Sequence, residues 1–263
     1  MSLLRSCACS QSMLESDDFQ MWVERMKGRR SWMHRKLWEW CYIAQALSER
    51  NLLKPGIRGL GFAVGQEPLP ALFASYGSDI VATDLDTHEA KERGWVETNE
   101  HAAELNELNK AQICPDDIFK QQVSFRFVDM NKIDDDLKGF DFVWSSCSVE
   151  HLGSLEHGKQ FIYNSIKCLK PGGYAIHTTE YNISSNEKTL EDGPAVIYRE
   201  RDIKEIGHKL QTGGHRIELD FTLGNKPFDL QVDFPPYKQD VHLRLELSGY
   251  VCTSYGLIIQ KAF

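Results

Sequence analysis

Two glycines, Gly61 and Gly65, separate an apolar run from a segment that begins like a helix. Glycine adopts left-handed backbone conformations at little cost, so this pair predicts a tight turn that exposes bare main chain to a ligand. Pro68 and Pro70 follow, and proline fits the first turn of a helix, where its missing N–H has no partner to lose. The segment 56–74 therefore predicts a strand, a glycine turn and a helix.

An acid ends the next predicted strand, which spans residues 80–84 and closes on Asp84. A strand, a glycine turn, a helix and a second strand ending in an acid is the pattern that grips a nucleoside, with the acid on the ribose hydroxyls. The turn has Ala63 between its glycines, so it does not match the GxGxxG motif of dinucleotide sites. An ordinary βαβ turn without a ligand is the alternative at this point.

The rest of the chain continues the alternation of strands and helices. Further strands are expected at 123–130, 139–146, 174–178, 216–222 and 254–261, with helices at 155–169 and 199–212. We therefore expect an α/β fold with a doubly wound, mostly parallel, Rossmann-like sheet of seven strands, these five together with the two described above. The final strands lack a long helix between them, which predicts an antiparallel C-terminal strand.

The N-terminal region has a different character. We expect a helical cap or lid over residues 1–54, with a frayed end at 1–17 and helices within 18–50, followed by the main domain at 55–263. The cap is rich in tryptophan and basic residues, namely Trp22, Trp32, Trp38, Trp40, Arg25, Lys27, Arg29, Arg30, Arg35 and Lys36. Such a surface either packs on the main domain or receives an acidic acceptor.

Charge and cysteine content narrow the class of protein. The net charge of −8 argues against a broad nucleic-acid-binding surface. The seven cysteines include no CxxC pair, which favours free thiols in a reducing compartment. The sequence shows neither a signal peptide nor a membrane-spanning run, so we expect a cytoplasmic protein.

The order of these motifs resembles the class I S-adenosylmethionine-dependent methyltransferases, from about residue 55 onward. The resemblance rests on the glycine turn, on Asp84, on Asp129 after the third strand, and on Phe140-Asp141-Phe142-Val143 followed by Leu169-Lys170-Pro171-Gly172-Gly173-Tyr174. It implies S-adenosylmethionine as cofactor. The family usually has an acid two residues before the first glycine of the turn, and this chain has Gly59 there.

The resemblance also implies where the cofactor is held. The glycine turn would approach its methionine part, Asp84 its ribose, Asp129 its adenine amino group and Ser146 its sulfonium. The cofactor-binding residues that follow are Gly61, Phe62, Gly65, Glu67, Asp84, Leu85, Asp129, Met130, Ser146 and Cys147. Glu67 is expected to take over the role of the missing acid.

Candidate catalytic groups follow the fourth and fifth strands. His151 is our candidate general base for a hydroxyl acceptor, with Glu150, His177 and Glu180 as further candidates. Glu150-His151 also resembles part of the E-x-x-E-H metal motif of the ubiquinone-pathway O-methyltransferases and the small-RNA 3′-end 2′-O-methyltransferases, although Cys147 occupies the place of its first acid. Glu150, His151 and Glu180 are therefore a candidate Mg²⁺ site.

The sequence thus favours O-methylation of a sugar or glycan hydroxyl, because aromatic and basic side chains in the cap suit sugars with acidic groups. The stretches 35–67 and 144–153 also resemble methyltransferases associated with surface-polysaccharide synthesis. One alternative is a metal-assisted 2′-O-methyltransferase of an RNA terminus. Another is a cofactor-binding partner subunit without activity, which Gly59 at the acidic position favours.

Overall fold

The computed structural model describes residues 3–26, 33–92, 101–238 and 240–263 and is built on a ten-stranded sheet. The main strands follow the order β5 (Val123–Phe127), β4 (Asp79–Asp84), β3 (Arg58–Phe62), β6 (Phe140–Ser145), β7 (Leu169–Asn182), β12 (Tyr250–Gln260), β11 (Arg244–Leu247) and β9 (Val232–Asp233). Two short strands, β1 (Cys7–Ala8) and β8 (Arg216–Ile217), also pair with β12. A separate pair joins β2 (Met33–His34) and β10 (Val241–His242).

The direction of the strands confirms the predicted fold class. Strands β5, β4, β3, β6 and β7 are parallel neighbours, and β12 runs antiparallel to β7 and β11. The segment expected as a strand at 216–222 contributes only the two residues of β8, and β11 lies on the far side of β12 instead. Ser248 and Gly249 join β11 to β12 with φ of 51° and 89°, the left-handed pair that a tight two-residue hairpin needs.

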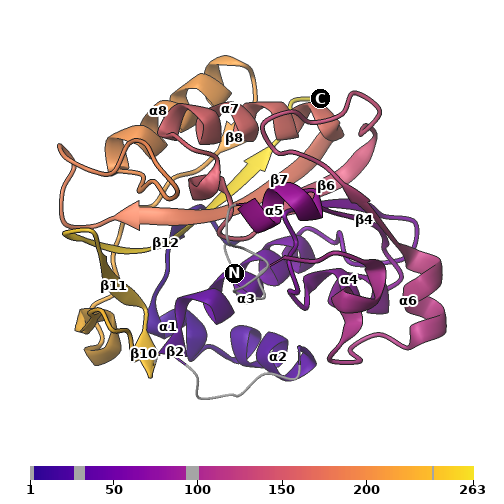
Figure 1. Ribbon diagram of the computed structural model, residues 1–263, viewed down its shortest axis with the longest axis horizontal. Helices are drawn as coiled ribbons and strands as arrows, with labels where there is room; N and C mark the ends of the chain where they lie inside the picture. Colours follow the sequence, from indigo (N-terminus) through magenta and orange to yellow (C-terminus); the bar gives the residue numbers. More distant parts are fainter. Residues whose placement is uncertain (1–2, 27–32, 93–100, 239) are drawn as a thin grey trace.

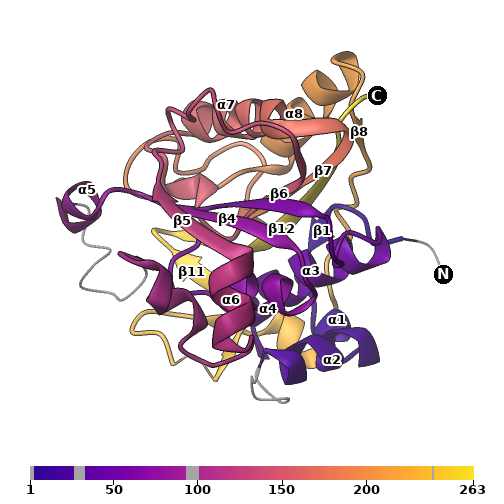
Figure 2. The same ribbon diagram turned by 90° about the vertical axis from the view of Figure 1, so that its right-hand side faces the viewer.

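Helices cover both faces of the sheet (Figures 1 and 2). Helices α7 (Leu155–Ser165) and α8 (Glu200–Thr212) lie on one face, and α3 (Arg35–Glu49), α4 (Leu69–Ser75) and α6 (Asp116–Gln122) lie on the other. The remaining helices are α1 (Gln11–Leu14), α2 (Asp17–Arg25), α5 (Thr87–Glu92) and the 3₁₀ turns η1 (Leu105–Asn109), η2 (Val149–His151), η3 (Ile166–Cys168) and η4 (Pro227–Leu230). No helix among the described ranges combines the length and the apolar character needed to cross a membrane.

The two helical layers enclose separate apolar cores because side chains alternate across a strand. On β7, Ala175 belongs to the core beneath α7 and α8, whereas its neighbour Ile176 belongs to the core beneath α3 and α4. Leu257 and Ile258 divide in the same way on β12. The face on which a residue lies therefore decides which helices its side chain meets.

The N-terminal residues are part of this architecture. Residues 1–17 were expected to fray, but Cys7 and Ala8 pair with β12, and Ser6 accepts a hydrogen bond from the Ile258 N–H at 2.9 Å. A strand of two residues has no periodicity that a sequence can reveal. The expected helical region contains α2 and α3, while Lys27, Arg29, Arg30 and Trp32 lie outside the described residues.

Helix α3 packs directly against β12 and β7. The close approach depends on Gly256 of β12, because a methyl group there would lie 2.1 Å from the ring of Tyr42 on α3. Tyr42 is fully buried and stacks on Trp38 with ring centroids 4.7 Å apart. The residues expected to form a cap thus share one core with the sheet.

This contact predicts that Gly256→Ala destabilises the protein by about 1–3 kcal/mol, because the added methyl overpacks the interface between α3 and β12. Denaturant unfolding measures the change. Gly213→Ala is the matched control, since Gly213 is exposed and a methyl there meets its nearest neighbour at 3.3 Å. Equal stabilities for the two variants would contradict the role given to Gly256.

Candidate active site

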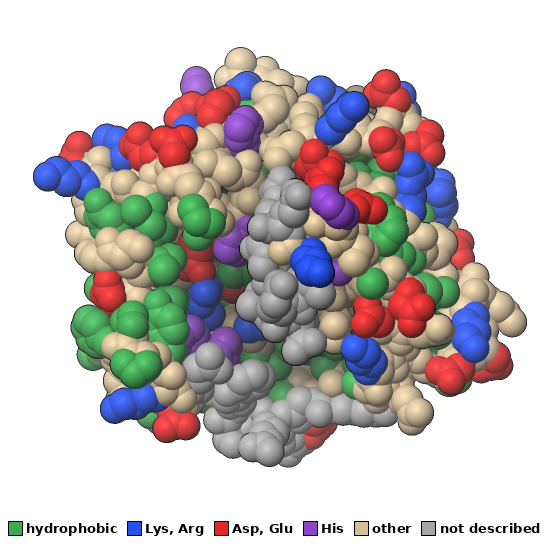
Figure 3. Space-filling model, viewed as in Figure 1, with side chains coloured by type: hydrophobic (Ala, Val, Ile, Leu, Met, Phe, Trp, Pro, Cys, Tyr) green, Lys and Arg blue, Asp and Glu red, His purple; other side chains and the backbone are tan. Residues whose placement is uncertain are grey.

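A cavity of about 340 Å³ opens at the carboxyl ends of β3, β4, β5 and β6, where ligands bind in doubly wound sheets. Its walls come from the loops after these strands and from α3. The lining residues are Lys36, Trp40, Ala63, Gly65, Gln66, Glu67, Asp84, Leu85, Val128, Asp129, Met130, Ser146, Cys147, Ser148, His151 and Leu152. Charged and histidine side chains gather in a hollow of the surface, left of centre in Figure 3.

The glycine turn is held against Asp84. Gly65 has a left-handed φ of 51°, and its N–H donates to Asp84 Oδ2 at 3.0 Å. The carboxylate also accepts from the N–H groups of Leu85 and Ala102 at 2.8 and 3.1 Å. Burial raises the pKa of Asp84, and these backbone donors oppose that rise. The acid that fixes the turn in this way is also one of the residues that line the cavity.

Gly61 and Phe62, both expected to bind a cofactor, do not line the cavity. A methyl group on Gly61 would lie 2.3 Å from the Trp144 ring, so this glycine is needed for packing inside the sheet layer. Phe62 is fully buried and meets Phe161 edge-on at 5.2 Å. The other expected cofactor-binding residues, Gly65, Glu67, Asp84, Leu85, Asp129, Met130, Ser146 and Cys147, all line it.

The same kind of packing explains why position 59 is a glycine and not an acid. A methyl group at this position would lie 2.3 Å from the ring of Phe142 on β6. The aromatic ring therefore occupies the space into which an acidic side chain would have to extend. Any anion that serves the end of the cavity beside α3 must come from another element.

The loop after β5 supplies the opposite end of the cavity. Val128 and Met130 are buried there, and Asp129 lies half-buried between them. Asp129 Oδ1 accepts a hydrogen bond from the Asn131 N–H at 2.8 Å. This end combines a carboxylate with apolar walls, which suits a flat heterocycle that carries an amino group.

His151 lies on η2 at the edge of the cavity. Its Nδ1 is 2.8 Å from the carbonyl oxygen of Pro194, and because a carbonyl only accepts, Nδ1 carries the proton in the neutral ring. Nε2 then carries the lone pair. The ring is thereby fixed in the tautomer that a general base acting through Nε2 requires.

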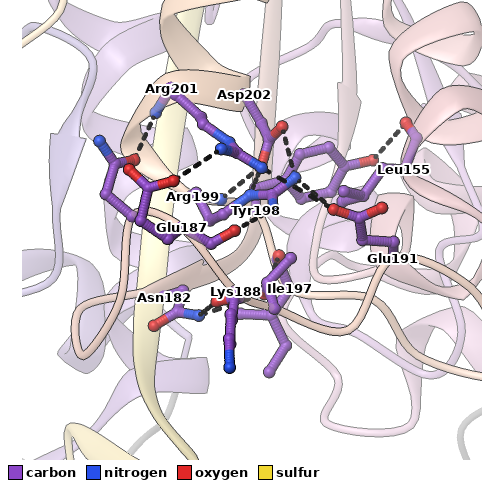
Figure 4. A network of polar contacts seen from close by, with 12 residues as sticks. Leu155, Asn182, Glu187, Lys188, Glu191, Ile197, Tyr198, Arg199, Arg201 and Asp202 are labelled. Carbon is purple, nitrogen blue, oxygen red and sulfur yellow. Dashed lines mark hydrogen bonds and ion pairs between the residues drawn. The ribbon is translucent and has the colours of Figure 1, made fainter.

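The loop that holds His151 is itself fastened to η2 and α7. The Val196 N–H donates to Glu150 O at 3.0 Å, Gly193 N–H to Gly153 O at 3.0 Å, and Leu155 N–H to Glu191 O at 2.9 Å. Figure 4 shows how Arg199 anchors the same loop. Its guanidinium bonds Asp202 and Glu191, each at 2.7 Å, and the carbonyl of Glu187 at 2.8 Å.

Buried charges join α3 to the floor of the cavity. The Arg35 guanidinium pairs with Glu180 of β7 and with Glu39, the latter at 3.7 Å. It also lies 3.5 Å from the sulfur of Cys147. Lys36 Nζ pairs with Glu39 at 3.2 Å and with Glu67 at 3.8 Å. Two of the basic residues expected on the surface of the N-terminal region, Arg35 and Lys36, are thus held in ion pairs, and Lys36 lines the cavity.

His177 was expected as a catalytic candidate, and the structure removes it from the site. It is fully buried on the α7 face of β7, with its ring nitrogens 2.8 Å from Ser145 Oγ and 3.0 Å from Ser165 Oγ. Burial lowers the pKa of His177 to about 3. Strand alternation explains the error, because Glu180 points to the opposite face, toward Arg35.

The expected Mg²⁺ site does not fit these side chains. Among the described residues, the group able to surround a metal is Cys147, Glu150 and Glu180, without His151. Mg²⁺ takes oxygen ligands in octahedral geometry, whereas burial, together with Glu150, raises the pKa of the Cys147 thiol. The Arg35 guanidinium already pairs with Glu180.

Several side chains line the cavity that were not expected there from the sequence. Lys36 and Trp40 were assigned to the cap as a whole, and Gln66 and Ser148 were not singled out. Arg35, Lys36 and Glu39 show i,i+3 and i,i+4 charge spacing, but Glu39 is fully buried. Charged residues are rarely buried unless they are paired. A charged residue on the otherwise apolar face of a predicted helix is therefore the sequence signal that such a helix belongs to a site.

Comparisons with solved structures agree with the fold. The chain is similar to magnesium protoporphyrin IX methyltransferase (ChlM) of Synechocystis PCC 6803, solved with bound SAH, at 14% identity over 96% of this chain and 98% of that chain, with a TM-score of 0.52. It is also similar to TehB of Haemophilus influenzae, at 13% identity over 86% of this chain and 67% of that chain, with a TM-score of 0.50. No family model and no curated protein sequence matches the chain. At these identities the likeness establishes the fold.

The buried charges predict a pH-dependent effect of Arg35→Met. Loss of the guanidinium leaves Glu39 and Glu180 with less compensation, so the variant should be destabilised by about 3–5 kcal/mol near neutral pH. The pKa of Glu180 is already raised by burial and rises further without Arg35. A protonated carboxyl needs no cation, so the deficit should shrink as the pH falls.

Denaturant unfolding at about pH 8 and about pH 5.5 measures this difference. Lys204→Met, which removes an exposed pair with Glu200, is the control and should change stability by less than about 0.5 kcal/mol at either pH. A deficit for Arg35→Met that is the same at both pH values would show that packing, and not charge, causes it.

Proposed function

We propose that this protein is an S-adenosylmethionine-dependent methyltransferase that methylates a hydroxyl of a sugar or glycan, with His151 as general base. One observation carries the proposal, namely a single cavity with Asp84 and Asp129 along its length and the His151 ring at its edge. The two acids suit the ribose and adenine of the donor. The glycine turn offers backbone near the centre, and the shared fold supports the same class of cofactor.

The chemistry needs little from the protein beyond alignment. A lone pair of the acceptor oxygen forms a new bond to the methyl carbon of the donor as the carbon–sulfur bond breaks. The electron pair of the broken bond passes to the sulfonium sulfur, which becomes a neutral thioether. The acceptor proton goes to His151 Nε2. Pro194 O, hydrogen-bonded to Nδ1, stabilises the imidazolium that forms.

The sugar acceptor is supported by the aromatic wall of the cavity. Trp40 lies on that wall, and an indole face stacks well on the apolar face of a sugar ring. Transfer to an RNA terminus with metal assistance is less well supported, because the net charge is −8 and the acids beside Cys147 do not suit Mg²⁺. The alternative of a cofactor-binding partner subunit without activity stays open. Conversion of the donor into its demethylated product would decide against it.

Two measurements test the proposal directly. Titration calorimetry with S-adenosylmethionine and S-adenosylhomocysteine should give binding heat with the wild-type protein. Incubation with the donor and a panel of nucleotide sugars, oligosaccharides and short RNAs should then give a product heavier by one methylene group. A folded protein that binds neither form of the cofactor would refute the assignment.

Asp84→Ala should weaken cofactor binding by about 1–3 kcal/mol, because charge-assisted hydrogen bonds to the ribose are lost. Asp84 also accepts from three backbone N–H groups, so a thermal melt must accompany the calorimetry. Asp129→Ala provides a second variant, because within the described part of the chain the Asp129 carboxylate accepts a single backbone hydrogen bond, from the Asn131 N–H. Unaltered cofactor affinity in both variants would place the nucleoside elsewhere.

His151→Ala should lower turnover by roughly 10²–10⁴-fold while cofactor affinity stays unchanged, because the ring acts on the acceptor proton alone. Initial rates with the acceptor found in the panel, beside calorimetry with S-adenosylhomocysteine, separate the two effects. His157→Ala is the matched control, since His157 lies on α7 and is not among the lining residues of the cavity. Equal rates for the two variants would exclude His151 as the base.

A further inference from the structure

A second cavity, of about 160 Å³, lies at the other end of α3 from the active site. Lys36 in the first turn of α3 lines the active-site cavity, whereas Arg50, which directly follows the helix, lines this one. With a rise of about 1.5 Å per residue, the helix separates these two positions by about 20 Å. The second cavity is therefore distinct from the site of methyl transfer.

The walls of this second cavity carry an excess of positive charge. Among the described residues that line it, three are arginines, namely Arg5, Arg50 and Arg216, and one is an acid, Glu218. Arg5 Nε pairs with Glu218 at 3.3 Å, and both side chains are exposed. That pair leaves the charges of Arg50 and Arg216 in excess at the cavity. In a chain with a net charge of −8, such a local excess favours an anionic ligand.

Arg50 is held in place mainly by uncharged groups, although its side chain is only 8% exposed. Its guanidinium donates to the carbonyl oxygens of Ala46 and Leu4 at 2.9 and 2.8 Å and lies over the ring of Tyr174, 5.2 Å from the centroid. Its ion pair with Glu49 is long, at 3.7 Å, and the same carboxylate oxygen also accepts from the Leu4 N–H at 2.6 Å. These contacts fix the position of the guanidinium without cancelling its charge.

Strand pairing turns Arg216 toward the same cavity. Arg216 lies opposite Gln260 in the antiparallel pair of β8 and β12, and residues directly opposite in such a pair have their side chains on one face. Gln260 and Ile258 are two residues apart on β12, so they share that face, and both line the cavity. Ile258 belongs to the core beneath α3. Arg216 thus lies on the α3 face of the sheet, as Arg50 does.

We propose that this second cavity binds the phosphate group of a small phosphorylated molecule, with Arg50 and Arg216 as its cationic ligands. A guanidinium stays charged at physiological pH and presents its N–H donors in a planar fork, which suits the several oxygens of a phosphate dianion. Leu4 and Ile258 provide an apolar wall for the rest of the molecule. A ligand that holds Arg50 also holds the end of α3, so its binding stabilises the folded protein.

Titration calorimetry at constant ionic strength tests this assignment, with inorganic phosphate and glycerol 3-phosphate as probes and glycerol as the uncharged comparison. The wild-type protein should bind both phosphate probes and not glycerol, and each phosphate probe should raise the thermal unfolding midpoint. Arg216→Met and Arg50→Met should each weaken the binding of both phosphate probes by about 10-fold or more, because a charge-assisted contact is lost. A thermal melt without ligand shows whether each variant is folded. Should Arg50→Met not fold, Arg216→Met alone decides, since Arg216 is exposed.

Arg201→Met is the matched control, because it removes the same charge from an exposed position on α8, where Arg201 pairs with Glu187. It should keep the affinity for both phosphate probes within about twofold. The inference is overturned if the wild type binds neither phosphate probe, or if Arg216→Met weakens binding no more than Arg201→Met does. Neither result bears on the proposed methyl transfer, because the described residues that line this cavity differ from those that line the active site.

Discussion

The guanidinium of Arg35 is the point at which the N-terminal region and the sheet depend on each other. It lies against Glu39 of its own helix, Glu180 of β7, Cys147 after β6 and Ser254 of β12. Charges this deeply buried are stable when paired, so these contacts favour the register in which α3 docks. That register also brings Lys36 and Trp40 to the cavity wall. Docking of the helix and completion of the site are thus the same event.

Glycines on one face of the sheet let aromatic rings pack close to the main chain. Gly256 of β12 leaves room for Tyr42 of α3, while Gly59 and Gly61 of β3 leave room for the rings of Phe142 and Trp144, which meet Phe73 of α4. The layer between the sheet and the helices α3 and α4 is therefore filled by large aromatic groups that lie close to bare backbone. In the proposed enzyme, glycines that look like a ligand-binding motif in the sequence divide their work, with Gly65 at the cavity and Gly61 in the packing.

Much of the fold could be predicted from the sequence, because each parallel strand is followed by a turn or helix signal that is local. The acids at the strand ends were also readable, since Asp84 and Asp129 occupy positions that topology alone brings to one edge. The role of His151 stays a proposal, and its contact with the carbonyl of Pro194 is one that no sequence pattern indicated. Such long-range partners depend on a loop path that local patterns do not determine.

The errors have equally specific causes. His177 and Glu180 were grouped because they are near in sequence, although a period of two already assigned them to opposite faces of β7. The position of α3 against the sheet could not be predicted from the sequence. A helix with several charged residues is expected to face solvent unless the residues that pair with those charges are known. The additional short strand β1 follows from pairing with a strand that is almost the whole chain away.

Strand β12 has a consequence for synthesis on the ribosome. It lies between β7 and β11 and also pairs with β1 and β8, yet it is translated after every one of them. Until residues 250–260 leave the exit tunnel, β7 has an open edge, and the first strand of the chain has no partner. A nascent chain of this protein therefore keeps an unfinished sheet until residues 250–260 are inserted.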